Sequence, residues 1–455
     1  MDSERKKGLS SLPNTGVLIE NARALGTTVP HWALKEAARD YVEVMRSRIL
    51  AGEDESNSVD YQAILSAAEK IARPLLQRVI NATGVILHTN LGRAPLSSKA
   101  RARVLEATGY CDLEFDLETG TRSSRHDGVA SLLSFTVGAE DAVVVNNNAA
   151  AVLLCLSAIC SQKEAIVSRG ELVEIGGSFR VPDVMSQSGA KLVEVGTTNK
   201  TRLSDYGNAI GENTGAVVKI HRSNFDIVGF VEETEIRELA PVCKNKKIPL
   251  LYDLGSGLLE AQAGLEKLGL PAIHSVERAL ADGASLVMFS GDKVLGAGQA
   301  GVIAGSKSLV SLVKRHPLMR CLRPDKLALA SLIATLEQYR DGQGGAVPAR
   351  AMMDEPADSV QSRACMLADA LGEHTSLKIA VVATECTVGG GCAPQSKIPS
   401  FAVSVTGKPS GKVVHALRNA RVPVVPRVSD GAVFLEVRTI PSEDFPSVIE
   451  SVRGL

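Results

Sequence analysis

The feature that most constrains the fold is an alternation of short apolar runs with helical segments between about residues 73 and 322. Helical periodicity is clearest at Ala149–Ile159 and Glu232–Cys243. Strands that are apolar on both faces and joined by crossover helices form a mostly parallel sheet with helices on both sides. The sequence therefore predicts an α/β domain with a doubly wound sheet, and we expect its strands at Ala142–Val145, Ala165–Val167, Lys191–Val195, Ala216–Ile220, Pro249–Tyr252 and Ser285–Phe289.

The segments on either side of this domain have different patterns. Residues 1–72 contain short amphipathic stretches, Trp32–Ile49 and Tyr61–Ile71 among them, separated by polar residues. The last part of the chain opens with a long helical pattern and continues with strand, helix and strand patterns, at Lys326–Tyr339, Ser400–Thr406, Lys412–Ala420 and Ala432–Val437. We therefore expect an N-terminal helical domain (1–72), the large α/β domain (73–322) and a small C-terminal α+β domain (323–455).

Charge and composition exclude several classes of protein. The 455 residues include 50 Lys and Arg against 51 Asp and Glu, so the chain is not a uniformly basic nucleic-acid-binding protein. No apolar run of membrane-spanning length and no signal-peptide pattern is present, so we expect neither a membrane span nor secretion. The eight cysteines show neither a CxxC pair nor zinc-knuckle spacing, which predicts reduced thiols, a cytoplasmic protein and no metal site.

Two charged residues stand where predicted strands end. Asp253 follows Pro249–Tyr252, and Lys293 lies on a tight turn after Ser285–Phe289. Ligands of open α/β sheets bind at the carboxyl ends of the strands. A carboxylate there can keep a pyridine nitrogen protonated and a lysine can form a Schiff base, as pyridoxal phosphate requires. The alternative interpretation is a surface Asp and a surface Lys at loop ends.

A third element is the run Asn146-Asn147-Asn148-Ala149 between a predicted strand and a predicted helix. Main-chain N–H groups at a helix N-terminus bind anions such as a cofactor phosphate, although asparagine also serves as an ordinary helix cap. The chain order of phosphate loop, Asp and Lys matches that of aminotransferase-like (fold type I) enzymes. A GxGxxG run at Gly296–Gly301 precedes a predicted strand instead of a helix, so it is not a dinucleotide-binding fingerprint.

Several arginines lie in loops of the predicted cofactor domain and at its end, where guanidinium groups can bind phosphate-like anions. Taken singly, each of them is more simply a solvated surface residue. As a group they are candidates for an anion site: Arg93, Arg122, Arg125, Arg320 and Arg323. His221 follows another predicted strand and is a candidate for a position beside the cofactor.

Long stretches of the chain resemble bacterial selenocysteine synthase, L-seryl-tRNA(Sec) selenium transferase. The resemblance covers nearly the whole chain and includes the segments Arg78–Val85, His88–Leu96, Asp116–Gly120, Asn146–Ala149, Glu194–Lys200, Lys219–Phe225, Asp253–Gly257, Ser290–Lys293, Ile398–Ser400 and Glu436–Thr439. The resemblance implies a pyridoxal-phosphate enzyme that converts L-seryl-tRNA(Sec) to L-selenocysteinyl-tRNA(Sec) with selenophosphate. The reaction would run by β-elimination and β-addition through an aminoacrylyl intermediate.

The same resemblance implies roles for individual residues. Lys293 would form the Schiff base, Asp292 would assist proton transfer and Asp253 would pair with the pyridine nitrogen. The other candidates for contacts to the cofactor are Asn146, Asn147, Asn148, Ala149, His221, Ser256 and Ser290. The five arginines would bind selenophosphate, in part from a neighbouring subunit. The tRNA would bind to the N-terminal domain of a homo-oligomer, a decameric ring of dimers.

Two other functions remain open at this point. Some relatives share the catalytic domain and act on small substrates, so the alternative is a pyridoxal-phosphate-dependent lyase for a small phosphorylated amino compound. An RNA-binding or scaffold protein on a degenerate enzyme fold is a third hypothesis. The presence of both Asp253 and Lys293 argues against it, because a scaffold has no physical need for either residue.

Overall fold

The computed structural model describes residues 9–52, 59–175, 179–225, 227–259, 275–373, 375, 377–389, 392, 396–453 and 455. The chain divides into two compact units, and the boundary falls between Arg78 and Val79. The three-domain division expected from the sequence stays a prediction.

The N-terminal unit is built of helices α2 (Thr15–Ala24), α3 (His31–Ala51) and α4 (Tyr61–Ile71). The last two correspond to the helices predicted from the amphipathic stretches. Leu18, Leu34 and Ile64 are fully buried and belong to one core that all three helices share. Asn14 caps α2 and Asp60 caps α4 with side-chain oxygens, which fixes where these two helices begin.

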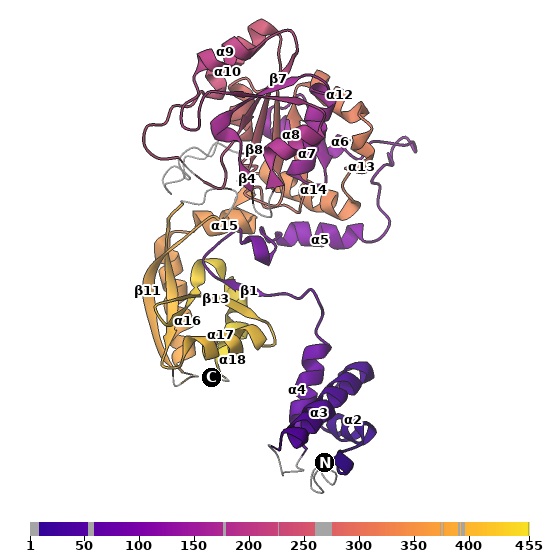
Figure 1. Ribbon diagram of the computed structural model, residues 1–455, viewed down its shortest axis with the longest axis vertical. Coiled ribbons are helices and arrows are strands. Elements are labelled where there is room, and N and C mark those ends of the chain that lie inside the picture. Colours follow the sequence, from indigo (N-terminus) through magenta and orange to yellow (C-terminus); the bar gives the residue numbers. More distant parts are fainter. Residues whose placement is uncertain are drawn as a thin grey trace. The chain divides into compact units, whose positions relative to one another are not determined.

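The second unit contains a seven-stranded sheet of order β2-β10-β9-β8-β7-β3-β6. Strand β10 runs antiparallel to both of its neighbours, β2 and β9, and the other adjacent pairs are parallel, so the predicted mostly parallel sheet is confirmed. Figure 1 shows this sheet, with β7 and β8 labelled, and helices packed around it. The strands are β2 (Asp141–Val145), β3 (Glu164–Ser168), β6 (Lys191–Val195), β7 (Thr214–Ile220), β8 (Leu250–Gly255), β9 (Leu286–Ser290) and β10 (Gly301–Gly305). All six predicted strands are present, and β10 is the strand expected after the GxGxxG run.

Two apolar cores lie on opposite faces of this sheet, because neighbouring residues of each strand point to opposite sides. In β2, Val144 belongs to one core and Val143 and Val145 to the other. The first core is covered by α6 (Asp127–Val137), α9 (Leu203–Ala209), α10 (Ile236–Lys246), α11 (Val276–Ala281) and α14 (Lys326–Arg340). The second is covered by α7 (Asn148–Ile159), α8 (Val181–Gln187), α12 (Lys307–Arg315) and α13 (Leu318–Cys321).

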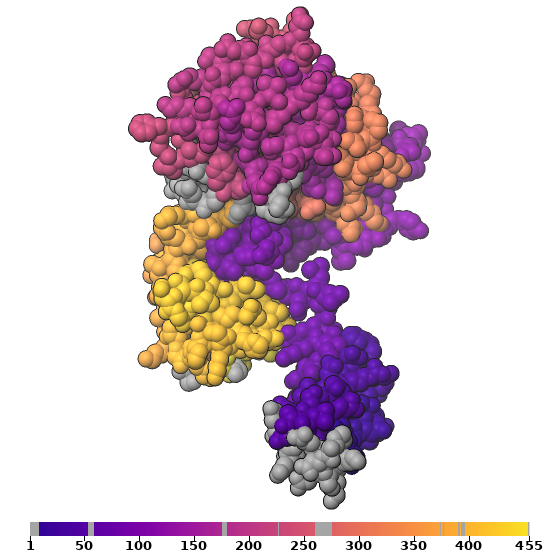
Figure 2. All heavy atoms as spheres, viewed as in Figure 1, coloured from indigo at the N-terminus to yellow at the C-terminus, as the bar shows by residue number. Residues whose placement is uncertain are grey.

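A second, five-stranded sheet has the order β1-β13-β14-β12-β11. Its strands are β1 (Ile80–Ala82), β11 (Lys378–Cys386), β12 (Ile398–Thr406), β13 (Val424–Ser429) and β14 (Ala432–Glu436). Its core is completed by α16 (Ala357–Gly372), α17 (Ser410–Asn419) and α18 (Phe445–Arg453), which appear in orange to yellow in Figure 2. Other described elements are α5 (Ser98–Ala107), α15 (Pro348–Asp354) and the small pair β4 (Glu174–Ile175) and β5 (Phe179–Arg180).

Two segments pack against a part of the chain other than the one expected from their position in the sequence. Strand β1 pairs in parallel with β13, Ile80 opposite Val424, and so joins the sheet of the C-terminal part. Helix α14 buries Leu329 and Leu332 in the core of the large sheet, so the expected boundary at residue 322 precedes a helix that belongs to that core. Within the described residues, no helix is both long and apolar enough to cross a membrane.

Candidate active site

Asp253 lies near the carboxyl end of β8, where the strand register against β9 shifts between Asp253 and Gly255. Such an irregularity bends the strand and re-aims its side chains. Gly255 and Gly257 both have positive φ, +72° and +78°, which a residue with a side chain adopts only under strain. A Cβ atom on Gly257 would lie 2.5 Å from the main-chain oxygen of Ser290, so glycine is required for this close approach.

Lys293 lies in the turn that follows β9, directly beside the chain that leaves Asp253. A Cβ atom placed on Gly255 would lie 3.8 Å from the Nζ atom of Lys293. The turn is fixed by main-chain bonds from Gly291 N–H to Ala300 O (2.9 Å) and from Val294 N–H to Ser256 O (3.1 Å). The Asp and Lys that the sequence singled out therefore lie close together, Asp253 near the end of β8 and Lys293 in the turn after the neighbouring strand β9.

The carboxylate of Asp253 is buried, with only 9% of the residue exposed. Burial raises its pKa, and a hydrogen bond from Asn148 and the charge of Lys293 act in the opposite direction. The amide nitrogen Nδ2 of Asn148 donates to Oδ1 of Asp253 at 2.7 Å. The carboxylate is thus held between a neutral donor and a cation.

The three asparagines before α7 have different environments. The N–H of Asn146 donates to the main-chain oxygen of Leu322 (2.8 Å), and the residue is exposed. The side chain of Asn147 caps α7 by accepting from the N–H of Ala150 at 2.9 Å. The N–H groups of Asn148 and Ala149 lie in the first turn of α7, where helix geometry provides no partner within the helix. This turn is the part of the segment suited to an anion.

These elements surround one cavity of about 280 Å³. Its lining contains eight of the residues that the sequence predicted, namely Arg93, Asn147, Asn148, Ala149, Asp253, Ser290, Asp292 and Lys293. Val152, Val181, Val184 and Gln299 complete the described lining. The sequence analysis missed these four. The three valines carry no signal that separates them from core residues, whereas Gln299 lies in the glycine-rich turn near Lys293.

Arg93 forms an ion pair with Asp292, the residue next to Lys293. Its Nη1 atom donates to Oδ2 of Asp292 at 2.6 Å, and the N–H of Ala94 donates to the Asp292 main-chain oxygen at 3.2 Å. Arg93 has a left-handed backbone (φ 62°) after the short 3-10 helix Thr89–Leu91. The side chain of Arg93 is 39% exposed and that of Asp292 is 12% exposed, so the pair lies at the border of cavity and solvent.

The other four predicted arginines do not line this cavity. Arg125 binds Glu114 through Nε (2.8 Å) and Nη2 (2.6 Å) and also donates to the main-chain oxygen of Pro324. Arg122 donates to the same carboxylate at 3.1 Å but is 78% exposed. Arg320 and Arg323 are exposed. The hydrogen bond from Arg125 lowers the pKa of Glu114, and the charges of Arg122 and Arg323 add to the effect.

The last three predicted residues, Asn146, His221 and Ser256, lie beside the cavity without appearing in its described lining. The N–H of His221 donates to the main-chain oxygen of Asp253 at 2.9 Å, so this residue continues β7 next to the end of β8. Ser256 is fully buried, and its Oγ atom has no hydrogen-bond partner among the described residues. The same holds for the Oδ1 atom of Asn148.

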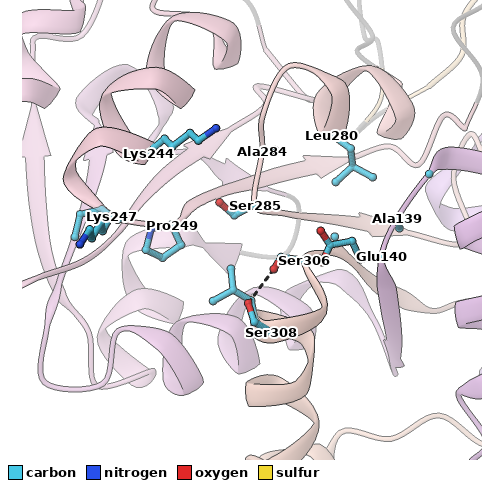
Figure 3. Close-up of a pocket in the computed structure, with 14 residues that line it drawn as sticks. Ala139, Glu140, Lys244, Lys247, Pro249, Leu280, Ala284, Ser285, Ser306 and Ser308 are labelled. Carbon is cyan, nitrogen blue, oxygen red and sulfur yellow. Dashed lines mark hydrogen bonds between the residues drawn. The ribbon is translucent and has the colours of Figure 1, made fainter.

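A second hollow lies at the opposite edge of the large sheet, where β8 and β9 begin (Figure 3). Lys244, Lys247 and Glu140 contribute its charged groups. The Glu140 carboxylate accepts from the N–H of Lys307 (2.8 Å), so it caps α12. None of the predicted site residues lines this hollow, so the cavity beside Lys293 is the candidate active site.

The family model for L-seryl-tRNA selenium transferase matches residues 79–441. The chain belongs to this family. It is 40% identical to the L-seryl-tRNA(Sec) selenium transferase of Alkaliphilus oremlandii, with 98% of each chain covered. It is 42% identical to the one of Geobacter sulfurreducens, which covers 98% of this chain and 99% of the relative. The resemblance noted in the sequence is therefore confirmed.

Among solved structures, the chain is similar to a D-glucosaminate-6-phosphate ammonia-lyase, with a TM-score of 0.59 and 20% identity. The match covers 83% of this chain and 95% of that one. The predicted aminotransferase-like, fold type I architecture is confirmed. The cofactor expected from the sequence is pyridoxal phosphate, and the family whose model matches is named for a seryl-tRNA substrate.

The residues of the cavity fit this cofactor. Asp253 offers a buried carboxylate for the pyridine nitrogen, and Lys293 offers an amine a short distance away. The first turn of α7 offers main-chain N–H groups for the phosphate. The two buried oxygens without a partner, on Asn148 and Ser256, are the kind of atoms that a polar ligand satisfies.

Proposed function

We propose that the protein converts L-seryl-tRNA(Sec) to L-selenocysteinyl-tRNA(Sec), with selenophosphate as the selenium donor. One observation carries the proposal. Asp253, Lys293 and the first turn of α7 meet in one cavity of a chain that belongs to the L-seryl-tRNA selenium transferase family. The match to relatives of this name covers 98% of the chain and so includes the N-terminal helices. We propose that these helices, α2 to α4, bind the tRNA.

Each residue of the cavity has a role in this proposal. When bound, pyridoxal phosphate withdraws electrons from the α-carbon of the seryl group, which allows β-elimination and β-addition. Asp253 holds a proton at the pyridine nitrogen, because a buried carboxylate next to it stabilises the positive charge. Lys293 binds the cofactor, removes the α-proton and later returns it. Asp292, adjacent in the chain, assists the proton transfer to the leaving hydroxyl group.

The remaining cofactor contacts follow from position. The N–H groups of Asn148 and Ala149 bind the phosphate, and the Asn147 cap keeps the first turn of α7 in place for them. Asn146 anchors the same segment to Leu322. Three residues would border the ring. Ser256 and Ser290 are buried, and the main-chain N–H of His221 donates to the main-chain oxygen of Asp253.

For the selenium donor we propose Arg93 as the first contact, since it is the one predicted arginine in the described lining of the cavity. Guanidinium groups replace the water that an oxyanion loses on binding. Arg122, Arg125, Arg320 and Arg323 would complete the site from a neighbouring subunit of a homo-oligomer, which we propose is a decamer. Large exposed apolar residues between 105 and 135 support such contacts, namely Leu105, Tyr110, Phe115, Leu117 and Phe135.

The test is a reconstituted reaction in the presence of pyridoxal phosphate. Purified protein, serine-charged tRNA(Sec) and selenophosphate should yield selenocysteinyl-tRNA, detected after deacylation and derivatisation of the amino acid. Uncharged tRNA(Sec) and serine-charged tRNA(Ser) are the controls, and neither should give product. Turnover of a small phosphorylated amino compound without tRNA, together with no selenium transfer, would contradict the proposal and favour the lyase alternative.

A further inference from the structure

We propose that Asn148 is a positioning residue that holds the carboxylate of Asp253, and thereby controls how firmly the cavity retains pyridoxal phosphate. The inference deepens the proposed function and rests on it, because it concerns the same cofactor. From the sequence we expected Asn148 to contact the cofactor phosphate. Its side chain, however, is directed to the carboxylate.

The contact depends on the way in which α7 crosses the sheet. Asn148 begins α7 after a two-residue connection from β2, and two strands, β10 and β9, separate β2 from β8 in the sheet. Helix α7 packs over both intervening strands, which brings its first residue to the carboxyl end of β8. The 2.7 Å bond between Asn148 and Asp253 therefore joins two edges of the cavity that are 105 residues apart in the chain.

The chemistry of the two groups fixes the orientation of the amide. An ionised carboxylate only accepts hydrogen bonds, so Nδ2 of Asn148 must face Asp253. The Oδ1 atom then points away, and it is buried without a partner among the described residues. A buried acceptor left unpaired costs free energy, so the orientation that binds the carboxylate leaves Oδ1 as an atom that a polar ligand of the cavity can satisfy.

The surroundings of Asp253 show why such a donor matters. Lys293 is a cation near this carboxylate, and the buried Cys155 and Tyr252 also lie within electrostatic range of it. Burial raises the pKa of Asp253, whereas Asn148 and Lys293 lower it. Lys293 is the residue proposed to bond to the cofactor, so its charge changes during the reaction. The hydrogen bond from Asn148 is donated by a neutral amide and does not depend on that charge.

The first experiment compares Asn148→Ala with a matched control, Asn419→Ala. Asn419 also donates its amide to an oxygen, that of the His415 main chain (2.7 Å), but lies at the end of α17, which packs on the five-stranded sheet. Apoenzymes are titrated with pyridoxal phosphate, and the visible absorbance band gives the dissociation constant. We expect Asn148→Ala to weaken cofactor binding about ten- to a hundredfold, the effect of losing one hydrogen bond to a charged group. The control should bind like the wild type.

The second variant, Asn148→Asp, separates positioning from simple packing. Above the pKa of the resulting carboxyl pair both groups are ionised, and the new carboxylate at the first turn of α7 repels the cofactor phosphate that this turn would bind, so the cofactor should bind more weakly than in Asn148→Ala. Below that pKa the pair shares one proton, and the new carboxyl can donate to Asp253 as the amide does. Relative to the wild type at each pH, the affinity of Asn148→Asp should therefore recover as the pH falls, whereas that of Asn148→Ala should not.

The outcomes distinguish this inference from the proposed function. Wild-type protein that binds no pyridoxal phosphate would refute the proposed function itself. If the wild type binds pyridoxal phosphate and a folded Asn148→Ala variant binds it with the same affinity, only the role of Asn148 is refuted. Thermal unfolding of each apoenzyme shows whether the variant is folded. The role of Asn148 is likewise refuted if the affinity of Asn148→Asp for pyridoxal phosphate, relative to that of the wild type, is the same at every pH.

Discussion

Replacing Arg93 by Ala tests whether the donor site includes the cavity. Two contributions to the effect can be separated. The first is stability: the ion pair with Asp292 has side-chain exposures of 39% and 12%, between those of surface pairs and buried pairs. Surface pairs contribute about 0–1 kcal/mol, and breaking a buried pair costs about 3–5 kcal/mol. We therefore expect Arg93→Ala to lower the free energy of unfolding by about 1–2 kcal/mol.

The second contribution is catalytic. Loss of a charge-assisted contact to a donor oxyanion costs about 1.5–3 kcal/mol, which corresponds to roughly a ten- to hundredfold lower rate of selenium transfer at limiting selenophosphate. Elimination of the seryl hydroxyl group does not involve the donor and should remain largely intact. The assay follows selenium incorporation into seryl-tRNA(Sec) as a function of selenophosphate concentration, and measures loss of the hydroxyl group separately in its absence.

Two further variants separate charge from backbone strain. Arg93→Gly removes the guanidinium group but relieves the left-handed conformation (φ 62°), so it should be about 1 kcal/mol more stable than Arg93→Ala and equally poor in selenium transfer. Arg237→Ala, on a pair with Glu235 in which both side chains are exposed (61% and 52%), is the stability control and should change little. If the rate of selenium transfer depends on selenophosphate concentration in both Arg93 variants as it does in the wild type, Arg93 does not contact the donor and has only a structural role.

Three other substitutions or deletions test the remaining assignments. Lys293→Ala should fold but lose the visible absorbance of bound cofactor and all turnover; a borohydride-reducible adduct on another lysine would contradict the assignment. A protein comprising residues 79–455 should fold, because this unit has its own cores, and should bind pyridoxal phosphate but not tRNA(Sec); unchanged tRNA affinity in a filter-binding assay would place recognition elsewhere. Glu171→Ala should lower the free energy of unfolding by about 3–5 kcal/mol, because Glu171 is buried and ion-paired with Lys219. A denaturant titration measures this change, and a value below about 1 kcal/mol would mean that the pair is not desolvated.

Much of the candidate site could be predicted because its signals are local. The end of an apolar strand is visible in the sequence, and residues that follow such ends meet at one edge of a parallel sheet. Asp253, Lys293 and the start of α7 were found in this way, and the structure places them around one cavity. The donor arginines were a weaker prediction. Arg93 lines the cavity, but Arg125 is engaged by Glu114, a partner that no sequence pattern indicated.

By itself the sequence determined the elements: the strands of the large sheet, the helices between them and the polar residues that follow. These depend on periodicities of a few residues, which each segment carries independently of the rest. Tertiary structure alone decided which distant residues meet. Strand β1 joins β13 across more than 340 residues, Arg93 reaches Asp292, and Asn148 reaches Asp253 over two intervening strands. The physical reason is that such contacts depend on strand order and on the path of α7 across the sheet. Both are set by the packing of the whole core, and no short segment encodes them.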